Sequence, residues 1–275
     1  MKRTIRLILA ALTALALPSC FQQESTITLN KDGSGTLTEQ MTLGAQALAM
    51  MAQIGALGGG GEPGADPLAD MASEEKALER AKAYGEGVTV EKVEAIPGKG
   101  VRRVFRFADI NKVKFDANSS MMEGLGEMPG AAEANAVAEK ADPISFKYAD
   151  GVLTVKLPQP DKPEAPAAEG SPDEPAGDVA GNPEMEAMMK EMMGDMRVSV
   201  KIVVPSGIEE STATFVDGNA VTLVEMDMGK ILKDPENLKK LTAVDQNDPG
   251  AAMEAFKGVE GAKAEMKPEI TIKVK

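Results

Sequence analysis

The chain has 275 residues, with 43 acidic and 30 basic side chains and a formal net charge of −13 at pH 7. Nucleic-acid binding needs clustered lysine and arginine, so this acidic balance excludes a nucleic-acid partner. With no histidine and a single cysteine, a Cys/His zinc site, a Ser-His-Asp triad and an internal disulfide are excluded as well. We therefore expect no cofactor.

The first nineteen residues have the pattern of a secretory signal peptide. Three basic side chains lie within residues 2–6, and an uncharged apolar run follows over residues 7–17. This run is too short to span a bilayer as a permanent helix. The tetrapeptide LPSC comes next and ends at Cys20, the single cysteine of the chain.

This tetrapeptide resembles the lipobox of bacterial lipoproteins, in which a leucine and small residues precede an invariant cysteine. The resemblance implies cleavage before Cys20, a diacylglycerol on its thiol and an acyl chain such as palmitate on its new amino group. Residues 20–24 would then be a lipidated tether that holds the protein on a membrane. Inner-membrane lipoproteins of Gram-negative bacteria carry an aspartate where this chain has Phe21. We therefore expect the outer membrane, with the protein facing the periplasm.

The segments after the tether alternate apolar and polar side chains in pairs, which predicts β-hairpins. Residues 25–31 and 36–43 flank the turn sequence KDGSG, whose glycines suit positive φ angles. Glu39 falls on the apolar face of the second segment, and the pattern does not explain it. Further alternating segments lie at 88–96, 101–110, 143–149, 152–158, 197–205, 211–216, 220–228 and 269–275.

One helix is predicted with clear ends, over residues 73–85. Ser73 is a suitable N-cap, acidic side chains occupy the first turn and Gly85 follows the last. Farther along, Arg102, Arg103 and Arg106 form a basic row in a predicted strand. We expect these three arginines on the solvent side of the strand, paired with surface carboxylates.

Proline-rich, acidic and glycine-rich stretches separate these elements. Residues 158–183 hold seven prolines and no aromatic residue, and such a stretch cannot bury enough apolar area to offset its ordering entropy. We expect α+β architecture: an antiparallel sheet of hairpins, a few helices on one face, and long loops or disordered insertions. The expected organisation is a signal peptide (1–19), the tether, a hairpin-rich region with a helical insertion (25–157), the disordered linker (158–183) and a Met-rich helix with a β-rich region (184–275) that shares the first region's sheet.

Residues 197–228 resemble part of the β-rich domain of LppM-like bacterial lipoproteins, where a strand ending in Pro-x-Gly precedes a polar hairpin and a Gly-Asn-x-Val strand. The matching residues here are Pro205, Gly207, Gly218, Asn219 and Val221. The resemblance implies a β-rich lipoprotein domain and assigns no catalytic residue.

Six methionines recur at helical spacing between residues 184 and 196 and form one apolar stripe: Met185, Met188, Met189, Met192, Met193 and Met196. Three interpretations stay open. The stripe packs into the core, because methionine fills irregular gaps; it is a face for a partner or lipid; or its thioethers bind Cu(I).

From the sequence we predict a membrane-anchored envelope lipoprotein with a non-catalytic binding or structural role. Its anchor is the lipidated Cys20, and its partner is an envelope protein or an apolar ligand. One alternative is a periplasmic lipoprotein that binds an apolar ligand or Cu(I) through the Met-rich helix. Another is an envelope hydrolase that uses carboxylates, which requires two titratable groups converging in a pocket.

Overall fold

The computed structural model describes residues 21–45, 48, 67–116, 142–158, 194–234, 236–237 and 257–275. The helices are α3 (Pro67–Met71), α4 (Glu74–Tyr84), the 3-10 helix η2 (Ile110–Lys112) and α8 (Met228–Ile231). The strands are β1 (Phe21–Leu29), β2 (Gly35–Leu43), β3 (Thr89–Ile96), β4 (Gly100–Phe107), β5 (Lys114–Phe115), β6 (Ile144–Ala149), β7 (Val152–Lys156), β8 (Arg197–Val203), β9 (Ile208–Ser211), β10 (Val216–Asp217), β11 (Ala220–Asp227), β12 (Ala262–Ala264) and β13 (Glu269–Val274).

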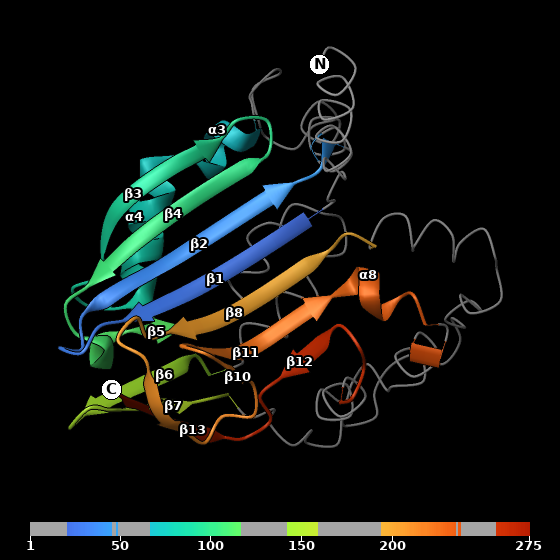
Figure 1. The fold of residues 1–275 in the computed structure, drawn as a ribbon. Helices are drawn as coiled ribbons and strands as arrows, with labels where there is room; N and C mark the ends of the chain where they lie inside the picture. The colour runs from blue at the N-terminus through green and yellow to red at the C-terminus, as the bar shows by residue number, and fades with distance from the viewer. Residues whose placement is uncertain are drawn as a thin grey trace, which may run out of the picture.

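Within this part of the chain the strands form two sheets (Figure 1). The larger sheet has eight strands, in the order β10-β11-β8-β1-β2-β4-β3 with β12 beside β11. The smaller sheet has five strands, in the order β5-β6-β7-β13-β9. Each sheet therefore contains strands that precede residues 159–193 and strands that follow them.

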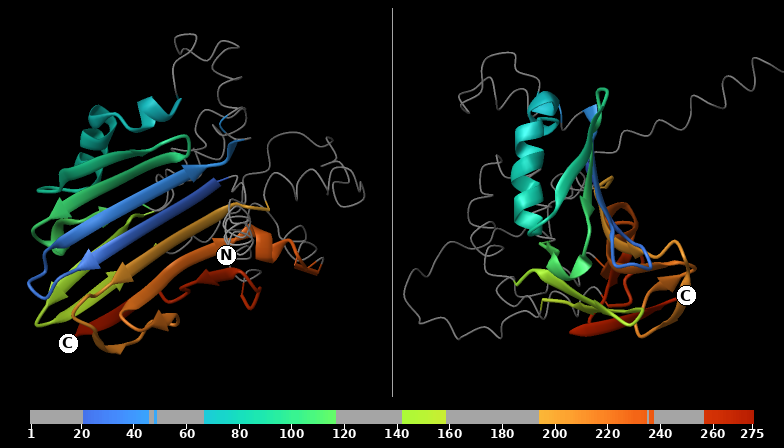
Figure 2. Two further views of the ribbon diagram at one scale, coloured as in Figure 1. Left: turned by 45° about the horizontal axis from the view of Figure 1, so that its top comes forward. Right: turned by 90° about the vertical axis from the view of Figure 1, so that its left-hand side faces the viewer.

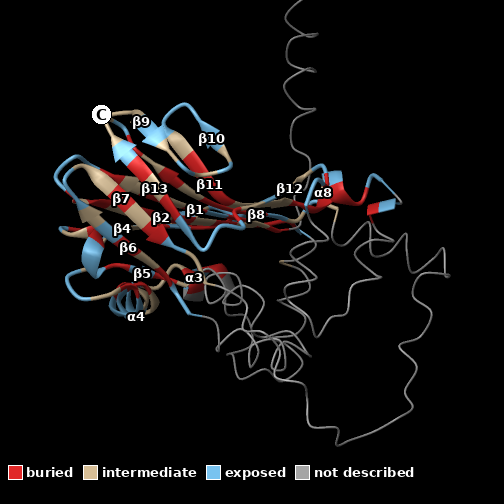
Figure 3. Cartoon of the chain, turned by 90° about the horizontal axis from the view of Figure 1, so that it is seen from below, coloured by how far each residue is buried: buried red, intermediate tan, exposed pale blue. Residues whose placement is uncertain are grey.

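The smaller sheet and α4 lie against the same face of the larger sheet (Figure 2). One main core fills the space between them. It combines side chains from the larger sheet, α4 and the smaller sheet, for example Ile27, Phe105, Tyr84, Phe146 and Ile272. Burial alternates strictly along β1 and β2, with odd-numbered residues facing the core. Figure 3 shows the same division on α4, whose exposed residues face away from the sheets.

The expected α+β architecture is confirmed, including the hairpins β1–β2, β3–β4 and β6–β7. Local sequence determined these hairpins through their turns: Asp150 and Gly151, between β6 and β7, have φ angles of 53° and 77°. Aspartate and glycine are among the residues that tolerate this conformation in a two-residue turn. The predicted helix is α4, and the Ser73 hydroxyl accepts a hydrogen bond from the Lys76 amide at 3.3 Å.

The expectation of purely antiparallel pairing is wrong at the centre of the larger sheet. There β1 pairs with β8 in parallel, in a register that runs from Gln22 opposite Arg197 to Thr28 opposite Val203. A hairpin connection requires antiparallel neighbours, but a parallel pair needs a long crossover connection. The chain between Leu29 and Arg197 provides that connection, and it contains most of the other strands.

Two strand boundaries also differ from the predictions. Residues 21–24, expected in the tether, are the first residues of β1, where Phe21 and Gln23 are buried and pair with Leu43 and Met41 of β2. The segment 211–216, expected as one strand, divides instead between the end of β9 and the start of β10. The break arises because β9 pairs with β13 in the smaller sheet while β10 pairs with β11 in the larger one.

The structure explains the inward position of Glu39 through a buried ionic cluster. Two nitrogens of Arg80 in α4 donate to the Glu39 carboxylate at 3.0 and 3.2 Å, and the Tyr84 hydroxyl donates to the same group. Arg103 of β4 contacts the carboxylate at 3.8 Å and donates to the backbone carbonyl of Met71 at 2.7 Å. The cluster therefore joins β2 and β4 to α4 and to the end of α3.

Arg103 was predicted on the solvent side, and this prediction is wrong. Along β4 the side chains of Arg102 and Arg106 are exposed, but Arg103 is 2% exposed because the alternation of the strand turns it toward Glu39. Of the basic row, only Arg102 and Arg106 lie on the solvent side, and Arg106 pairs with the exposed Glu91 at 2.7 Å.

Replacing Glu39 with alanine should lower the free energy of unfolding by about 3–5 kcal/mol, because it removes a buried carboxylate that the part-buried Arg80 and the buried Arg103 both contact. Urea denaturation of protein that carries Cys20→Ala measures the change. Glu91→Ala is the matched control, since it removes a carboxylate from an exposed ion pair and should change stability little. Equal effects of the two substitutions would contradict the role given to the cluster.

Candidate functional site

Most residues of the predicted sites lie outside the described residues, namely the signal peptide, Cys20, the linker from residue 159 onward, and Met185, Met188, Met189, Met192 and Met193. Phe21, directly after the cysteine, and Met196, the last methionine of the stripe, are both described. The positions of these two residues show where the segment after Cys20 and the end of the methionine stripe enter the folded domain.

Phe21 and Met196 lie at the same end of the larger sheet. Gln22 is the first residue of β1 to pair with β8, and its partner is Arg197, so the preceding residues stand at neighbouring strand starts. We call this end the anchor end. It comprises the start of β1 at Phe21, the end of β2 at Leu43 and the β3–β4 turn at residues 97–99. It also includes residues 195–197 and the end of β11 with α8, residues 232–234 and residues 236–237 (Figure 1).

Two small apolar clusters occupy the anchor end, separate from the main core. The first cluster centres on Phe21, Leu43 and Val198, and the second on Ile231 and Val259. Of the six methionines that the structure describes, five belong to these clusters: Met41, Met71, Met196, Met226 and Met228. The main core, as described, contains aromatic, branched and alanine side chains and no methionine.

Met196 joins the two clusters. Its half-buried side chain packs against both, and its backbone carbonyl accepts a hydrogen bond from the Met228 amide at 2.9 Å. It was predicted as the last residue of a helix, but residues 194–196 form a turn and an extended residue that lead into β8. The reason is the pairing of β8, which begins at Arg197 and requires an extended entry.

An ionic contact fixes the end of β11 to the start of β8. Arg197 donates to the Asp227 carboxylate at 2.5 Å, and the same carboxylate accepts the Lys230 amide at 3.1 Å as the N-cap of α8. Burial opposes ionisation of Asp227, but the hydrogen bonds from Arg197 and from the Lys230 amide, together with the positive charges of both residues, outweigh it. The pKa of Asp227 is therefore lowered.

Buried carboxylates in the described part of the chain serve the fold. Glu39 holds α4, Asp227 caps α8, and Glu265 holds the segment between β9 and β10 by accepting the Thr214 amide at 2.5 Å and its hydroxyl at 2.9 Å. Within the same residues, no group of three or more Asp, Glu, Cys or His side chains is arranged to hold a metal ion. The paired carboxylates that a glycoside hydrolase needs are not brought together among these three.

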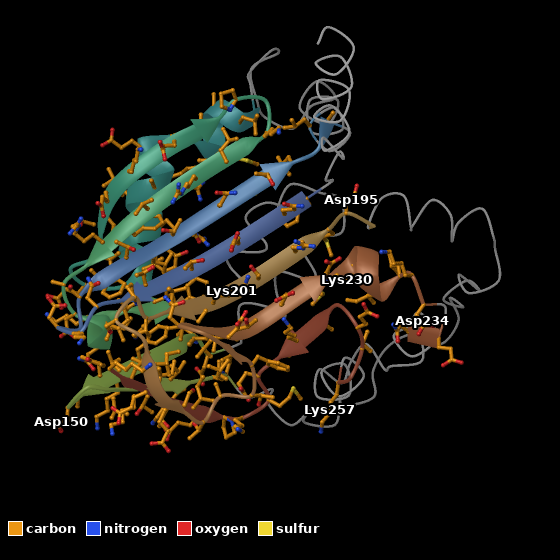
Figure 4. All side chains as sticks on the ribbon, in the orientation of Figure 1. Asp150, Asp195, Lys201, Lys230, Asp234 and Lys257 are labelled. Carbon is orange, nitrogen blue, oxygen red and sulfur yellow. The ribbon has the colours of Figure 1, made fainter. Side chains whose placement is uncertain are left out.

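The opposite end of the larger sheet carries a hollow of about 300 Å³, lined by both polar and apolar residues. Its lining comes from the β1–β2 turn and the ends of β3 and β4, and includes Asn30, Ser34, Thr89 and Arg106. Figure 4 places Asp150 at this end of the molecule, whereas Asp195 and Lys230 lie at the anchor end. Sequence reasoning identified no residue of this hollow as part of a site.

The outer face of the larger sheet is polar. Even-numbered residues of β1 and β2 point to it, and they pair across the strands as Thr26 with Thr38 and Thr28 with Thr36. Charged side chains on the flanking strands are paired, for example Lys263 with Glu225 at 3.1 Å. No helix within the described ranges is both long and apolar enough to cross a bilayer.

Comparison with known proteins gives only weak structural likeness. No protein-family model and no curated protein matches the chain. The NMR structure of the folded domain of LppM from Mycobacterium tuberculosis is similar with a TM-score of 0.32 and 11% sequence identity, over 77% of this chain and 85% of that chain. At this level the likeness is a weak resemblance in fold, and it assigns no role to any residue here.

The lowered pKa of Asp227 predicts an acid-labile contribution to stability. Because the folded-state pKa lies below the ordinary value of 3.8, the contribution is fully present above that value and is lost as the pH falls through the folded pKa. Asp227→Asn keeps a side chain that can cap α8 but removes the charge. The variant should therefore unfold at a lower temperature than the parent at pH 7, with a difference that shrinks in acid. A difference independent of pH would contradict this assignment.

Proposed function

We propose that the protein is a lipid-anchored bacterial envelope protein, held at the outer membrane through acylated Cys20 and facing the periplasm. Its role is to bind or support another envelope component without catalysis. The observation that carries the proposal is the lipobox-like tetrapeptide that ends at Cys20, followed at once by a buried strand that starts at Phe21. A folded domain that begins one residue after the cysteine is consistent with Cys20 as the first residue of the mature chain.

The inventory of reactive groups supports a non-catalytic role. The chain has no histidine, and its only thiol is the one assigned to the lipid. The three buried carboxylates of the described residues are engaged in contacts that fix secondary structure. Acid–base catalysis needs a group that can exchange its proton with a substrate, and these carboxylates are committed to arginine, hydroxyl or amide donors.

Two surfaces of the described structure are available to a partner in this proposal. One is the outer face of the larger sheet, with its paired threonines, and the other is the hollow at the end opposite the anchor. The outer face presents hydroxyl, amide and charged groups, and this chemistry favours a polar partner. The hollow has a mixed lining, with Asn30, Ser34 and Arg106 beside Phe107 and Ala108.

The anchor can be tested in bacterial cells that express the full-length chain. Wild-type protein should sediment with membranes, dissolve in detergent and yield an N-terminal peptide that begins at acylated Cys20 by mass spectrometry. Cys20→Ala should remove both the lipid and the membrane association, because no other thiol exists to accept diacylglycerol.

The matched control for this experiment is Ser19→Ala, which keeps a small residue before the cysteine and should be processed and acylated like the wild type. A wild-type chain that retains residues 1–19, carries no lipid and fractionates with cytosolic proteins would contradict the proposal. A Cys20→Ala protein that stays on membranes as firmly as the wild type would contradict it too.

A further inference from the structure

We infer that the anchor end of the larger sheet lies directly against the lipid headgroups, so that its strands lead away from the bilayer and the hollow at the opposite end faces the periplasm. This inference rests on the proposed acylation of Cys20 and adds to it the orientation of the domain. It identifies the membrane surface itself as the partner of a defined part of the fold.

No flexible segment separates Cys20 from the folded domain. Phe21 is 6% exposed and pairs with Leu43, and Gln22 already pairs with Arg197 on the other side. The Cα atoms of Cys20 and Phe21 are about 3.8 Å apart, as in any trans peptide. An acylated Cys20 therefore brings the start of β1 to the headgroup region, because strand pairing on both sides leaves no flexible segment.

The two faces of the larger sheet are unsuited to contact with the bilayer. The inner face of the larger sheet is covered by α4 and the smaller sheet. The outer face carries threonine, glutamine and paired charges, such as Lys201 near Glu24 at 4.0 Å and Lys92 with Glu94 at 2.5 Å. Burying these groups in a membrane interface would cost free energy. The end of the sheet is therefore the surface that approaches the membrane.

The anchor end combines apolar clusters with exposed charged side chains. Its apolar clusters combine branched and aromatic side chains with methionine, whose unbranched side chain adapts to irregular surroundings. Around them stand exposed lysines, Lys99 in the β3–β4 turn and Lys230 and Lys233 beside α8. Exposed carboxylates stand there as well: Asp195, Asp234 and Glu236. Lysine places its charge at a lipid–water boundary while its stem lies along apolar surface. These groups suit contact with a headgroup layer.

The test measures lysine acetylation by a water-soluble, membrane-impermeant ester, read peptide by peptide by mass spectrometry. Native acylated protein is reconstituted in vesicles of phosphatidylethanolamine and phosphatidylglycerol and compared with the lipid-free Cys20→Ala protein. Lys99, Lys230 and Lys233 should react several-fold more slowly on vesicles. Lys31 and Lys112, exposed at the opposite end, should react at unchanged rates.

A linker variant separates orientation from anchoring. Ten Gly/Ser residues inserted between Cys20 and Phe21 give a flexible spacer of about 17 Å root-mean-square length. This variant should bind vesicles as well as the wild type but lose the protection of the three anchor-end lysines.

The possible results separate the two proposals. Wild-type protein that binds vesicles yet shows no selective protection, or equal protection with and without the linker, would overturn the orientation and leave the anchor intact. Protection of Lys31 and Lys112 instead would also overturn it. Wild-type protein that does not bind vesicles and carries no lipid would overturn the proposed function, and the orientation with it.

Discussion

The parallel pairing of β1 with β8 is the interaction on which the rest of this structure depends. It joins the first strand of the domain to a strand that begins almost 170 residues later, with seven matched residue pairs from Gln22–Arg197 to Thr28–Val203. Because the two strands run in the same direction, the residue after Cys20 and the last residue of the methionine stripe stand at one end of the sheet. An antiparallel pair would have put Met196 and α8 beside the β1–β2 turn instead.

This arrangement separates the molecule into two kinds of packing. The main core uses aromatic and branched side chains, with rings such as Tyr84 stacked on Phe115 at a centroid distance of 5.9 Å. The Glu39 cluster adds a buried ionic contact that positions α4 on the larger sheet. A buried ion pair contributes little net stability over an apolar replacement, but breaking one partner is costly. We therefore assign the cluster a role in specifying where α4 docks.

At the anchor end the packing is different, because the branched and aromatic residues are joined there by methionines. Such side chains accommodate irregular neighbours at a smaller cost than rigid ones. In the orientation that we infer, this end meets the membrane, where that tolerance is useful. The difference in composition between the two regions thus agrees with the orientation that we infer for the anchored protein.

The features that were predictable from the sequence are local ones. Alternating residues and turn glycines determined the hairpins, and Ser73 and Gly85 determined the ends of α4. The parallel pair was not predictable, because nothing near β1 specifies a partner so distant in the chain. Arg103 was predicted on the wrong face of its strand, and the inward position of Glu39 was left unexplained. The reason is that each side chain pairs with a residue of another strand or helix. A signal for the early start of β1 did exist, since Phe21 is in phase with Ile27 and Leu29 on the buried face.

Disulfide trapping tests the parallel pairing most directly. In the Cys20→Ala background, Thr28→Cys with Val203→Cys places two thiols on paired residues of the outer face. Neighbouring strands are about 4.8 Å apart, within the Cα range that a disulfide accepts. Gln22→Cys with Val203→Cys is the matched control, since six residues of strand separate these positions by about 20 Å. The account predicts ready disulfide formation in the first variant and none in the second. Formation in the second variant alone would show antiparallel strands and contradict it.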